Sequence, residues 1–438
     1  MGGALALVGD DAAAKSSTVP SGSEIAMAEL GMPILVPADP QDILDLGIHG
    51  IEMSRFSGLW VGMKVATNVA DGSASATVSP TRTEVVRPDN RVDGRRYVHT
   101  VSARFLQPTL GQLEHSLMHE RLELARRYAA ANDVNRMWKR DGDRIGIVAA
   151  GDTYLAVRQA LDMLGLHPDT AAANGIRVLK LGMVFPLVTD TIENFADGLS
   201  EIIVVEEKRS FIESGIKDLL YGRPGTPAVT GKRNTDGTPL LRPDGDLGSE
   251  LIAKALAGRL SARLDIPSVD QWLAARSVPA TPARTALTLV PRTPFFCSGC
   301  PHNRSTQAPE GALVGAGIGC SGMALLMPAP RVGNVLGLSQ MGGEGASWIG
   351  MSPFVETNHM FQNIGDGTFH HSGSLAIRAA VAAGTNITFK LLYNSAVAMT
   401  GGQAAVGNLS IPDITRMLTA EGSRRSSSPP RNRLGIGA

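Results

Sequence analysis

The sequence is poor in cysteine, in net charge and in long apolar runs. Three cysteines in 438 residues exclude a disulfide framework, so the cytoplasm is the expected compartment. The 41 Lys and Arg residues balance 41 Asp and Glu residues, so the net charge is zero. No net electrostatic attraction to nucleic acid or to a membrane surface is therefore expected. No apolar run reaches the roughly 18 residues of a membrane-spanning helix, so no membrane span is predicted.

The composition is that of a folded α/β protein. Hydrophobic residues make up 43% and charged residues 19%, which supplies ample material for cores. The length predicts roughly three domains. Strand-like and helix-like segments alternate over residues 1–71 and again over 143–222. This alternation predicts parallel sheets with helices between their strands.

Other segments predict irregular structure. Residues 72–112 are polar and predict surface excursions or an inter-domain link, and 110–138 predict one long helix or two short ones. Residues 223–293 are rich in Gly, Pro, Asp and Arg and predict a linker or loose connector with one helical insert. The polar, basic tail 423–438 predicts disorder.

Polar residues end two neighbouring strands of the last α/β block. Asp366 and Asn394 lie 28 residues apart, which is close to the roughly 30 residues of a βαβ unit. Such strands are parallel, and ligands bind at the edge where their carboxyl ends meet. The helix between them is expected to begin near Ser372 or Ser374, with its phosphate-favouring N-terminus at the same edge.

One carboxylate and one amide oxygen suit Mg²⁺, which takes few protein ligands and keeps substrate phosphate and water. The backbone carbonyl of Ala396 is the predicted third protein ligand, so the pattern predicts Mg²⁺ with a diphosphate. The alternative is that Gly-Asp-Gly, residues 365–367, forms only a tight turn. The βαβ spacing and the sequence TGGQ at 400–403 favour the ligand site.

These motifs resemble the 2-oxoacid:ferredoxin oxidoreductases, and among them the large fused indolepyruvate ferredoxin oxidoreductases. The resemblance rests on GDG with Asn and TGGQ, on FCSGCPHNRST, on SQMGGEGASWIG and on LALVGDDAAAKSSTVPSGSE. It covers nearly all of residues 1–422 and fails over 423–438. It implies an α/β fold with these parts: an N-terminally truncated pyrimidine-binding thiamine diphosphate domain (1–135), a transketolase C-terminal-like domain (136–222), the linker (223–293), a pyrophosphate-binding thiamine diphosphate domain incomplete at its C-terminus (294–422) and an aberrant tail (423–438).

The resemblance implies oxidative decarboxylation of a 2-oxoacid, indolepyruvate or another aryl-pyruvate, with coenzyme A as acyl acceptor and ferredoxin as electron acceptor. Self-association is expected, because cofactor sites of this kind are shared between domains or subunits. Two alternatives stay open: a thiamine decarboxylase or acyl transferase without iron–sulfur, and an inactive fragment that serves as a binding or assembly module. The implied cofactor-binding residues are Gly365, Asp366, Gly367, Asn394, Ala396, Gly401, Gly402 and Gln403.

All three cysteines lie in the last block. Cys297 and Cys300 form a C-x2-C pair, and Cys320 follows 20 residues later, a spacing typical of zinc or iron–sulfur ligation. The alternatives are inert thiols or a zinc site with His302. The resembling proteins hold a [4Fe–4S] cluster on four cysteines, so the resemblance implies a cluster whose fourth ligand is not in this chain.

Three further residues are candidates for catalysis. His370 and His371 follow the GDG loop, and Glu344 lies in the sequence MGGEG. Loop packing or solvent contact is the equal alternative for the histidines, and an exposed acid in a Gly-rich turn is the alternative for Glu344. The glutamate that activates thiamine in the resembling proteins lies upstream of the segment that matches residue 1. We therefore expect the chain alone to be inactive.

Overall fold

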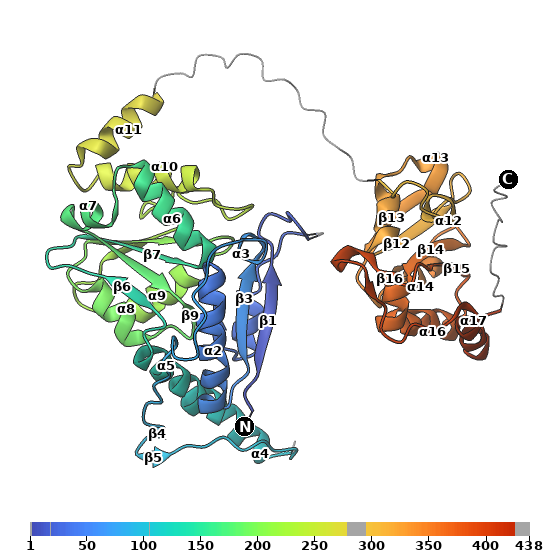
Figure 1. Cartoon of the computed structure of the whole chain (residues 1–438), viewed down its shortest axis with the longest axis horizontal. Coiled ribbons are helices and arrows are strands. Elements are labelled where there is room, and N and C mark those ends of the chain that lie inside the picture. The colour runs from blue at the N-terminus through green and yellow to red at the C-terminus, as the bar shows by residue number, and fades with distance from the viewer. Residues whose placement is uncertain (1, 18, 105, 278–294, 425–438) are drawn as a thin grey trace. The chain divides into compact units, whose positions relative to one another are not determined.

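The computed structural model describes residues 2–17, 19–104, 106–277 and 295–424. The chain divides into two compact units, Met1–Ala283 and Arg284–Ala438. Figure 1 shows that each unit is built from strands flanked by helices, so the predicted α/β class with parallel sheets is confirmed. Within the described ranges, no helix combines the length and the apolarity needed to cross a bilayer.

The first unit contains two sheets. The first sheet has the strand order β1-β3-β2-β9, in which the first three strands are parallel and β9 is antiparallel. Asp39 caps the helix that follows β2, because its side chain accepts the Asp42 backbone N–H and Pro40 occupies the first turn. The elements of this part are β1 (Leu5–Asp10), α1 (Glu24–Glu29), β2 (Ile34–Leu35), α2 (Pro40–Ser57), β3 (Val61–Ala66), α3 (Thr67–Ala70) and β9 (Met183–Phe185).

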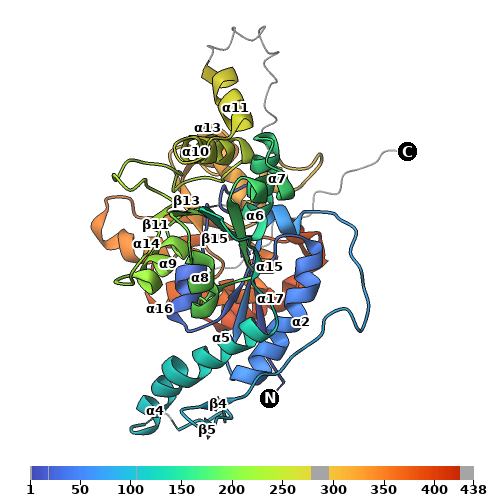
Figure 2. The same ribbon diagram turned by 90° about the vertical axis from the view of Figure 1, so that its left-hand side faces the viewer.

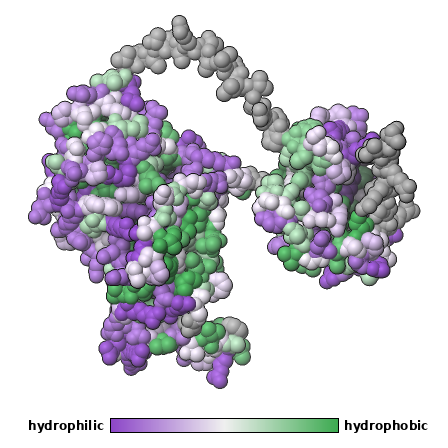
Figure 3. All heavy atoms as spheres, viewed as in Figure 1, coloured by the Kyte–Doolittle hydropathy of each residue, from purple (hydrophilic) through white to green (hydrophobic). Residues whose placement is uncertain are grey.

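Strand β1 lies at the edge of the first sheet. Leu7 on this strand is 72% exposed, and Trp60, which precedes β3, is 66% exposed. In Figure 3 hydrophobic surface gathers where Figure 1 draws β1 and β3. The edge of this sheet is therefore apolar as well as open.

A continuous helical rod covers the first sheet. It comprises α4 (Thr109–His115), the π-helical η1 (Ser116–Arg121) and α5 (Leu122–Ala131), so the single long helix is the correct alternative. Figure 2 shows the rod as one straight element. Ala125 and Tyr128 of α5 share a buried cluster with Leu46 and Met53 of α2. Between α3 and the rod, 72–108 is mostly exposed coil with one hairpin, β4 (Arg91–Val92) and β5 (Arg95–Arg96).

The second sheet has the order β11-β10-β7-β8-β6, with only β6 antiparallel to its neighbour. After β8 the chain turns at Gly182 and enters the first sheet as β9. A Cβ at Gly182 would lie 2.2 Å from the Val134 carbonyl oxygen, so this turn requires glycine. The elements are β6 (Arg136–Trp138), β7 (Ile145–Ala150), α6 (Gly151–Met163), α7 (Pro168–Ala173), β8 (Ile176–Leu181), α8 (Thr189–Ala196), β10 (Glu201–Val205), α9 (Ile212–Leu220) and β11 (Ala228–Thr230).

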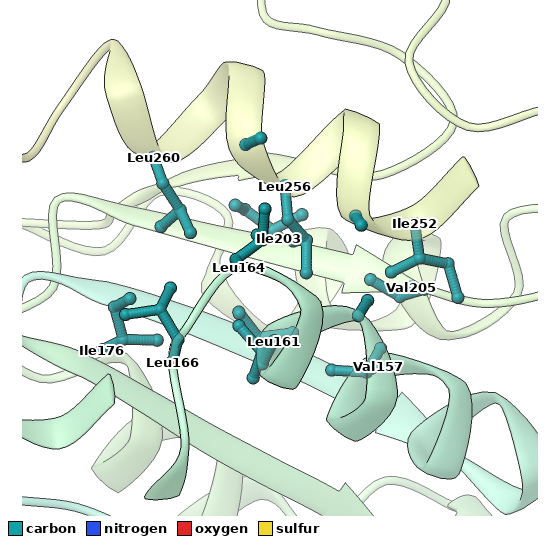
Figure 4. Close-up of a cluster of buried hydrophobic side chains, with 14 of the residues drawn as sticks. Val157, Leu161, Leu164, Leu166, Ile176, Ile203, Val205, Ile252, Leu256 and Leu260 are labelled. Atoms are coloured by element: carbon teal, nitrogen blue, oxygen red, sulfur yellow. The ribbon is translucent and has the colours of Figure 1, made fainter. Parts of the chain in front are cut away.

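The connector predicted over 223–293 is wrong for residues 228–272, although its one predicted helical insert is present as α10 (Ser249–Ser261). Strand β11 extends the second sheet, and α10 and α11 (Pro267–Ser277) follow it. Figure 4 shows Ile252, Leu256 and Leu260 of α10 directed at the side chains of α6 and β10, in one buried cluster. Residues 278–293 of that connector, and 425–438 of the predicted disordered tail, lie outside the described residues. The other domain boundaries stay predictions.

The second unit contains a third sheet of parallel strands in the order β13-β12-β14-β15. From β12 the chain first adds β13 on one side and later β14 on the other, so the strand order reverses between β12 and β14. Ligands of open α/β sheets bind outside the carboxyl ends at such a switch point. The elements are α12 (His302–Ser305), β12 (Leu313–Gly317), η2 (Cys320–Leu326), α13 (Ala329–Val332), β13 (Asn334–Ser339), α14 (Ala346–Met351), η3 (Ser352–Phe354), β14 (Met360–Gly365), α15 (Asp366–Thr368), η4 (Phe369–Gly373), α16 (Ser374–Ala382), β15 (Ile387–Leu392), β16 (Ala396–Val397), η5 (Ala398–Thr400), β17 (Gln403–Ala404) and α17 (Ile411–Ala420).

Candidate functional site

The pairing of β14 with β15 brings Asp366 and Asn394 together. Asp366 is 2% exposed, and its Oδ2 accepts the backbone N–H groups of Asn394 at 2.9 Å and Ser395 at 2.5 Å. Its Oδ1 accepts the N–H of Gly367 at 2.9 Å. Three backbone donors therefore fix the orientation of the carboxylate at the carboxyl edge of the sheet.

Asn394 and Ala396 belong to the turn that these bonds hold. The Asn394 Oδ1 accepts the Ala396 N–H at 3.0 Å. Ser395, between them, has a left-handed backbone with φ of 60°, which folds the chain back on itself. The three predicted Mg²⁺ ligands thus lie in one hydrogen-bonded arrangement, with Asp366 buried and Asn394 exposed.

The helix that follows β14 begins earlier than expected. The predicted start near Ser372 or Ser374 is wrong, because helical structure begins at Asp366 with Gly365 as its N-cap. It continues through the π-helical η4 into α16. The free N–H groups of the first turn and the positive end of the helix dipole therefore lie beside the Asp366 carboxylate, where they favour an anion.

The TGGQ segment forms the turn of the short hairpin β16–β17. Gly401 and Gly402 have φ of 115° and 80°, and Gln403 donates from Nε2 to the Thr400 carbonyl at 2.6 Å. These residues are exposed. Gly367 lets the hairpin approach, because a Cβ there would lie 3.0 Å from Cγ2 of Val397.

The two candidate histidines differ in their contacts. The His370 Nε2 accepts the Leu409 backbone N–H at 3.0 Å, so the ring proton is on Nδ1, which donates to the Asp366 carbonyl oxygen at 2.7 Å. Both ring nitrogens are engaged with backbone, which favours the packing alternative for His370. His371 is exposed and has Nδ1 2.8 Å from the Ser372 hydroxyl.

Glu344 is fully buried, so the exposed-acid alternative is wrong. Its Oε2 accepts the Gly342 backbone N–H at 2.8 Å, and its Oε1 has no hydrogen-bond partner among the described residues. Burial raises the pKa of Glu344 above its usual value, and the backbone bonds oppose that shift only in part. Composition alone could not reveal this burial.

The three cysteines lie on one side of the second unit. Cys300 and Cys320 are half-buried against a cluster that includes Phe296 and Met327, and Cys297 is exposed. Burial raises the pKa of Cys320, and the nearby thiols of Cys300 and Cys297 raise it further. The three thiols are therefore within electrostatic reach of one another.

These thiols do not converge as metal ligands. Within 295–424, the described part of the second unit, no three His, Cys, Asp or Glu side chains lie close enough together to hold a metal ion. His302 is buried, and burial lowers its pKa, while its Nδ1 lies 3.4 Å from the Ser305 hydroxyl. The cysteines, with or without His302, do not fit an iron–sulfur cluster or a zinc ion as they stand. A Mg²⁺ site needs only one carboxylate, and the oxygens around Asp366 fit it.

Two known families match the chain, one in each unit. Residues 135–274 match the indolepyruvate oxidoreductase domain, and residues 317–430 match the C-terminal TPP-binding domain of thiamine pyrophosphate enzymes. The second match contains Asp366, Asn394 and the hairpin after them. The thiamine diphosphate domain expected from the motifs is thereby confirmed.

Curated relatives align along most of the chain. The indolepyruvate oxidoreductase subunit IorA of Methanothermobacter thermautotrophicus is 27% identical over 388 residues, which cover 86% of this chain and 57% of the relative. The subunit of the same name from Thermococcus kodakarensis is 25% identical over 428 residues, which cover 94% of this chain and 62% of the relative. The chain thus spans about three-fifths of the length of these relatives.

Solved structures are more distant. A 2-oxoglutarate:ferredoxin oxidoreductase from Magnetococcus marinus is 13% identical with a TM-score of 0.36, over 58% of this chain and 48% of that one. A split-gene transketolase is 15% identical with a TM-score of 0.31, over 59% of this chain and 66% of that one. The two domain matches and the long alignments show that the chain is similar to indolepyruvate oxidoreductase IorA subunits along most of its length.

Proposed function

We propose that the second unit binds thiamine diphosphate through Mg²⁺ at the carboxyl edge of the third sheet, for the oxidative decarboxylation of a 2-oxoacid. The observation that carries the proposal is the Asp366 carboxylate. It is buried at the first turn of a helix and bonded to the turn that contains Asn394. The relatives' name supports indolepyruvate, or another aryl-pyruvate, as the substrate class.

Asp366, Asn394 and the carbonyl of Ala396 would hold the Mg²⁺. Oδ2 of Asp366 accepts two backbone N–H groups and Oδ1 accepts one, so the carboxylate is held in place and Oδ1 keeps a lone pair for the metal. The backbone N–H groups at the start of α15 would donate hydrogen bonds to diphosphate oxygens. Gly365 and Gly367 let the backbone come close to them, and the hairpin with Gly401, Gly402 and Gln403 would cover the site.

Thiamine diphosphate, when bound, supplies a carbon nucleophile and a sink for the electrons left when carbon dioxide departs. The chain's own contribution is to hold and orient it. His370 ties the helix that begins at Asp366 to the backbone at Leu409, and so keeps two borders of the site in register. His371 is the exposed imidazole next to this helix turn and is the candidate for contact with substrate.

Coenzyme A and ferredoxin are the proposed acyl and electron acceptors, on the strength of the family resemblance. No electron-transfer step is assigned to Cys297, Cys300 and Cys320, because these thiols do not converge on a metal-binding arrangement. The same observation favours a second candidate function, thiamine-dependent decarboxylation or acyl transfer without an iron–sulfur cluster. Iron and acid-labile sulfide, assayed after anaerobic purification, distinguish the two: stoichiometric amounts support the first and their absence supports the second.

Calorimetry with thiamine diphosphate and Mg²⁺ tests the cofactor site itself. We expect binding by the full chain, loss of binding in Asp366→Ala, and unchanged binding in Glu310→Ala, which alters an exposed acid of the same unit. Persistence of Mg²⁺-dependent binding in Asp366→Ala would contradict the ligand assignment.

A further inference from the structure

The switch point of the third sheet is bordered by two glycines. Gly317 ends β12 and Gly365 ends β14. A Cβ on Gly365 would lie 4.0 Å from the carbonyl oxygen of Ile318, the residue after Gly317, so the two strand ends run close together. Asp366 directly follows the end of β14 at this switch point. A ligand anchored at Asp366 would therefore extend along these strand ends.

Glu344 lies beside the other strand end at the switch point, that of β12. Its Oε1 is 2.9 Å from the position that a Cβ on Gly317 would take, and the Asn363 carbonyl oxygen is 3.4 Å from that same position. The carboxyl group is thus placed over the carboxyl end of β12, beside β14. Only glycine at 317 leaves room for it.

The described residues give the buried Glu344 carboxyl group too few hydrogen bonds to offset the cost of its burial. It has one hydrogen bond, from Gly342 to Oε2, and the buried Oε1 has none among the described residues. The two cations of this unit nearest along the chain are engaged elsewhere: Arg331 donates to the carbonyl and side-chain oxygens of Asn303, and Arg378 pairs with Glu421. A buried carboxyl oxygen without a partner is costly, and such an atom in a native protein calls for an explanation such as a bound ligand or ion.

Buried polar atoms without hydrogen-bond partners among the described residues also occur on β14. Gln362 and Asn363 on β14 are both fully buried. The Gln362 Oε1 and both side-chain polar atoms of Asn363 have no partner among the described residues. The end of β14 that leads to Asp366 is therefore unusually polar for the middle of a sheet.

We propose that Glu344 faces the positively charged ring of thiamine diphosphate, across the switch point from the Mg²⁺-diphosphate at Asp366. This inference rests on the proposed function. The ligand has an anionic end and a cationic thiazolium ring. The proposed Mg²⁺ ligands and the helix N-terminus would take the first, and the uncompensated acid would take the second. Glu344 is then a ring-binding residue supplied by the same unit that holds the diphosphate.

Comparing two ligands distinguishes contacts with the ring of the cofactor from contacts with its diphosphate. Dissociation constants are measured by calorimetry on the full chain, for thiamine diphosphate and for inorganic diphosphate, each with Mg²⁺. We expect Glu344→Gln, which keeps the shape of the side chain, to weaken thiamine diphosphate about tenfold and to leave inorganic diphosphate unchanged. Asp366→Asn should weaken both ligands. Glu356→Gln, an exposed acid of the same unit, should change neither.

A second variant keeps the proposal testable if Glu344→Gln does not fold. Gly317→Ala places a methyl group 2.9 Å from Oε1 and 3.1 Å from Cγ of Glu344, so it should displace the carboxyl group and weaken thiamine diphosphate selectively. The near-ultraviolet signal of Trp348, which is fully buried, reports the fold of the unit.

The outcomes are distinct. Equal thiamine diphosphate affinity in the unaltered chain and in both Glu344→Gln and Gly317→Ala would overturn the ring contact while leaving the proposed function intact. An equal loss for both ligands would also overturn it, because the effect would not be specific to the ring. Failure of the unaltered chain to bind thiamine diphosphate would instead defeat the proposed function, and the role of Glu344 with it.

Discussion

Asp366 and Asn394 end two parallel strands, and the Asp366 carboxylate accepts the Asn394 backbone N–H at 2.9 Å. This bond joins the start of one helix to the turn after the next strand. The same carboxylate is the proposed Mg²⁺ ligand, so one side chain both shapes the turn and serves the metal. Structure and binding at this edge of the sheet should therefore respond together when Asp366 is changed.

Loss of the Asp366 carboxylate should loosen the turn even without ligand. Three backbone N–H groups lose their acceptor in Asp366→Ala, and bonds to a charged group contribute about 1.5–3 kcal/mol each without being additive. We expect local opening of 393–404 to become easier by about 2–3 kcal/mol. Amide hydrogen exchange checks this, with Glu310→Ala as control; unchanged exchange over 393–404 would contradict it.

His370 should act as a brace between two segments. In His370→Ala the Leu409 N–H and the Asp366 carbonyl lose their shared partner. Hydrogen exchange should accelerate at Leu409 and in the first turn of α17 by roughly tenfold, since one bond contributes about 1 kcal/mol. In the control His371→Ala the ring that is lost bonds the neighbouring Ser372 hydroxyl, so α17 should be unchanged. Equal effects of the two substitutions would argue against the brace.

Glu206 should make the stability of the first unit depend on pH. Burial raises its pKa from 4.5 to about 7, although the side chain accepts N–H groups at the start of α9 from Phe211, Ile212 and Glu213. The folded state thus favours the protonated form. Its contribution to stability is fully present below pH 4.5 and is lost as pH rises to about 7, by about 3 kcal/mol in total.

Urea unfolding of the first unit at several pH values measures this dependence. Glu206→Gln should remove the part of the decline between pH 4.5 and 7 that belongs to this group, while Glu250→Gln, an exposed acid of α10, should preserve it. Identical pH profiles for the unaltered chain and Glu206→Gln would show that the side chain ionises freely in the fold.

Helix α10 should be essential to the stability of the first unit. Leu256 is 1% exposed in the cluster shared with α6, and Leu256→Ala should lower the free energy of unfolding by about 2–5 kcal/mol. Leu251→Ala, on the same helix but 46% exposed, is the control and should cost well under 1 kcal/mol. A loss of less than about 1 kcal/mol for Leu256→Ala would restore the connector interpretation.

Local patterns predicted much of this molecule. The alternation of strand-like and helix-like segments predicted the parallel sheets, and the spacing of Asp366 and Asn394 placed both on one sheet edge. Each of these relationships depends on residues close in sequence or on one βαβ unit. Such short-range relationships are where hydrophobic period and capping chemistry are informative.

The errors concern contacts between distant segments. The Gly- and Pro-rich composition before α10 resembles a linker, and only the packing of Leu256 against α6 reveals a core helix. Ser372 is a good N-cap residue in isolation, but helical structure already begins at Asp366, whose carboxylate is oriented by the turn after β15. Glu344 sits in a Gly-rich segment that resembles an exposed turn, and its burial depends on Gly317 of another strand.

The turn at Gly182 has a consequence for dividing the first unit into pieces. Strands β8 and β9 are separated by this one residue, yet they complete two different sheets. A shortened protein ending at residue 135 would leave β2 without its antiparallel neighbour and bare the backbone of that edge, which invites self-association. We therefore expect that neither sheet of the first unit can be expressed in soluble form without the other. A soluble fragment must extend beyond Phe185.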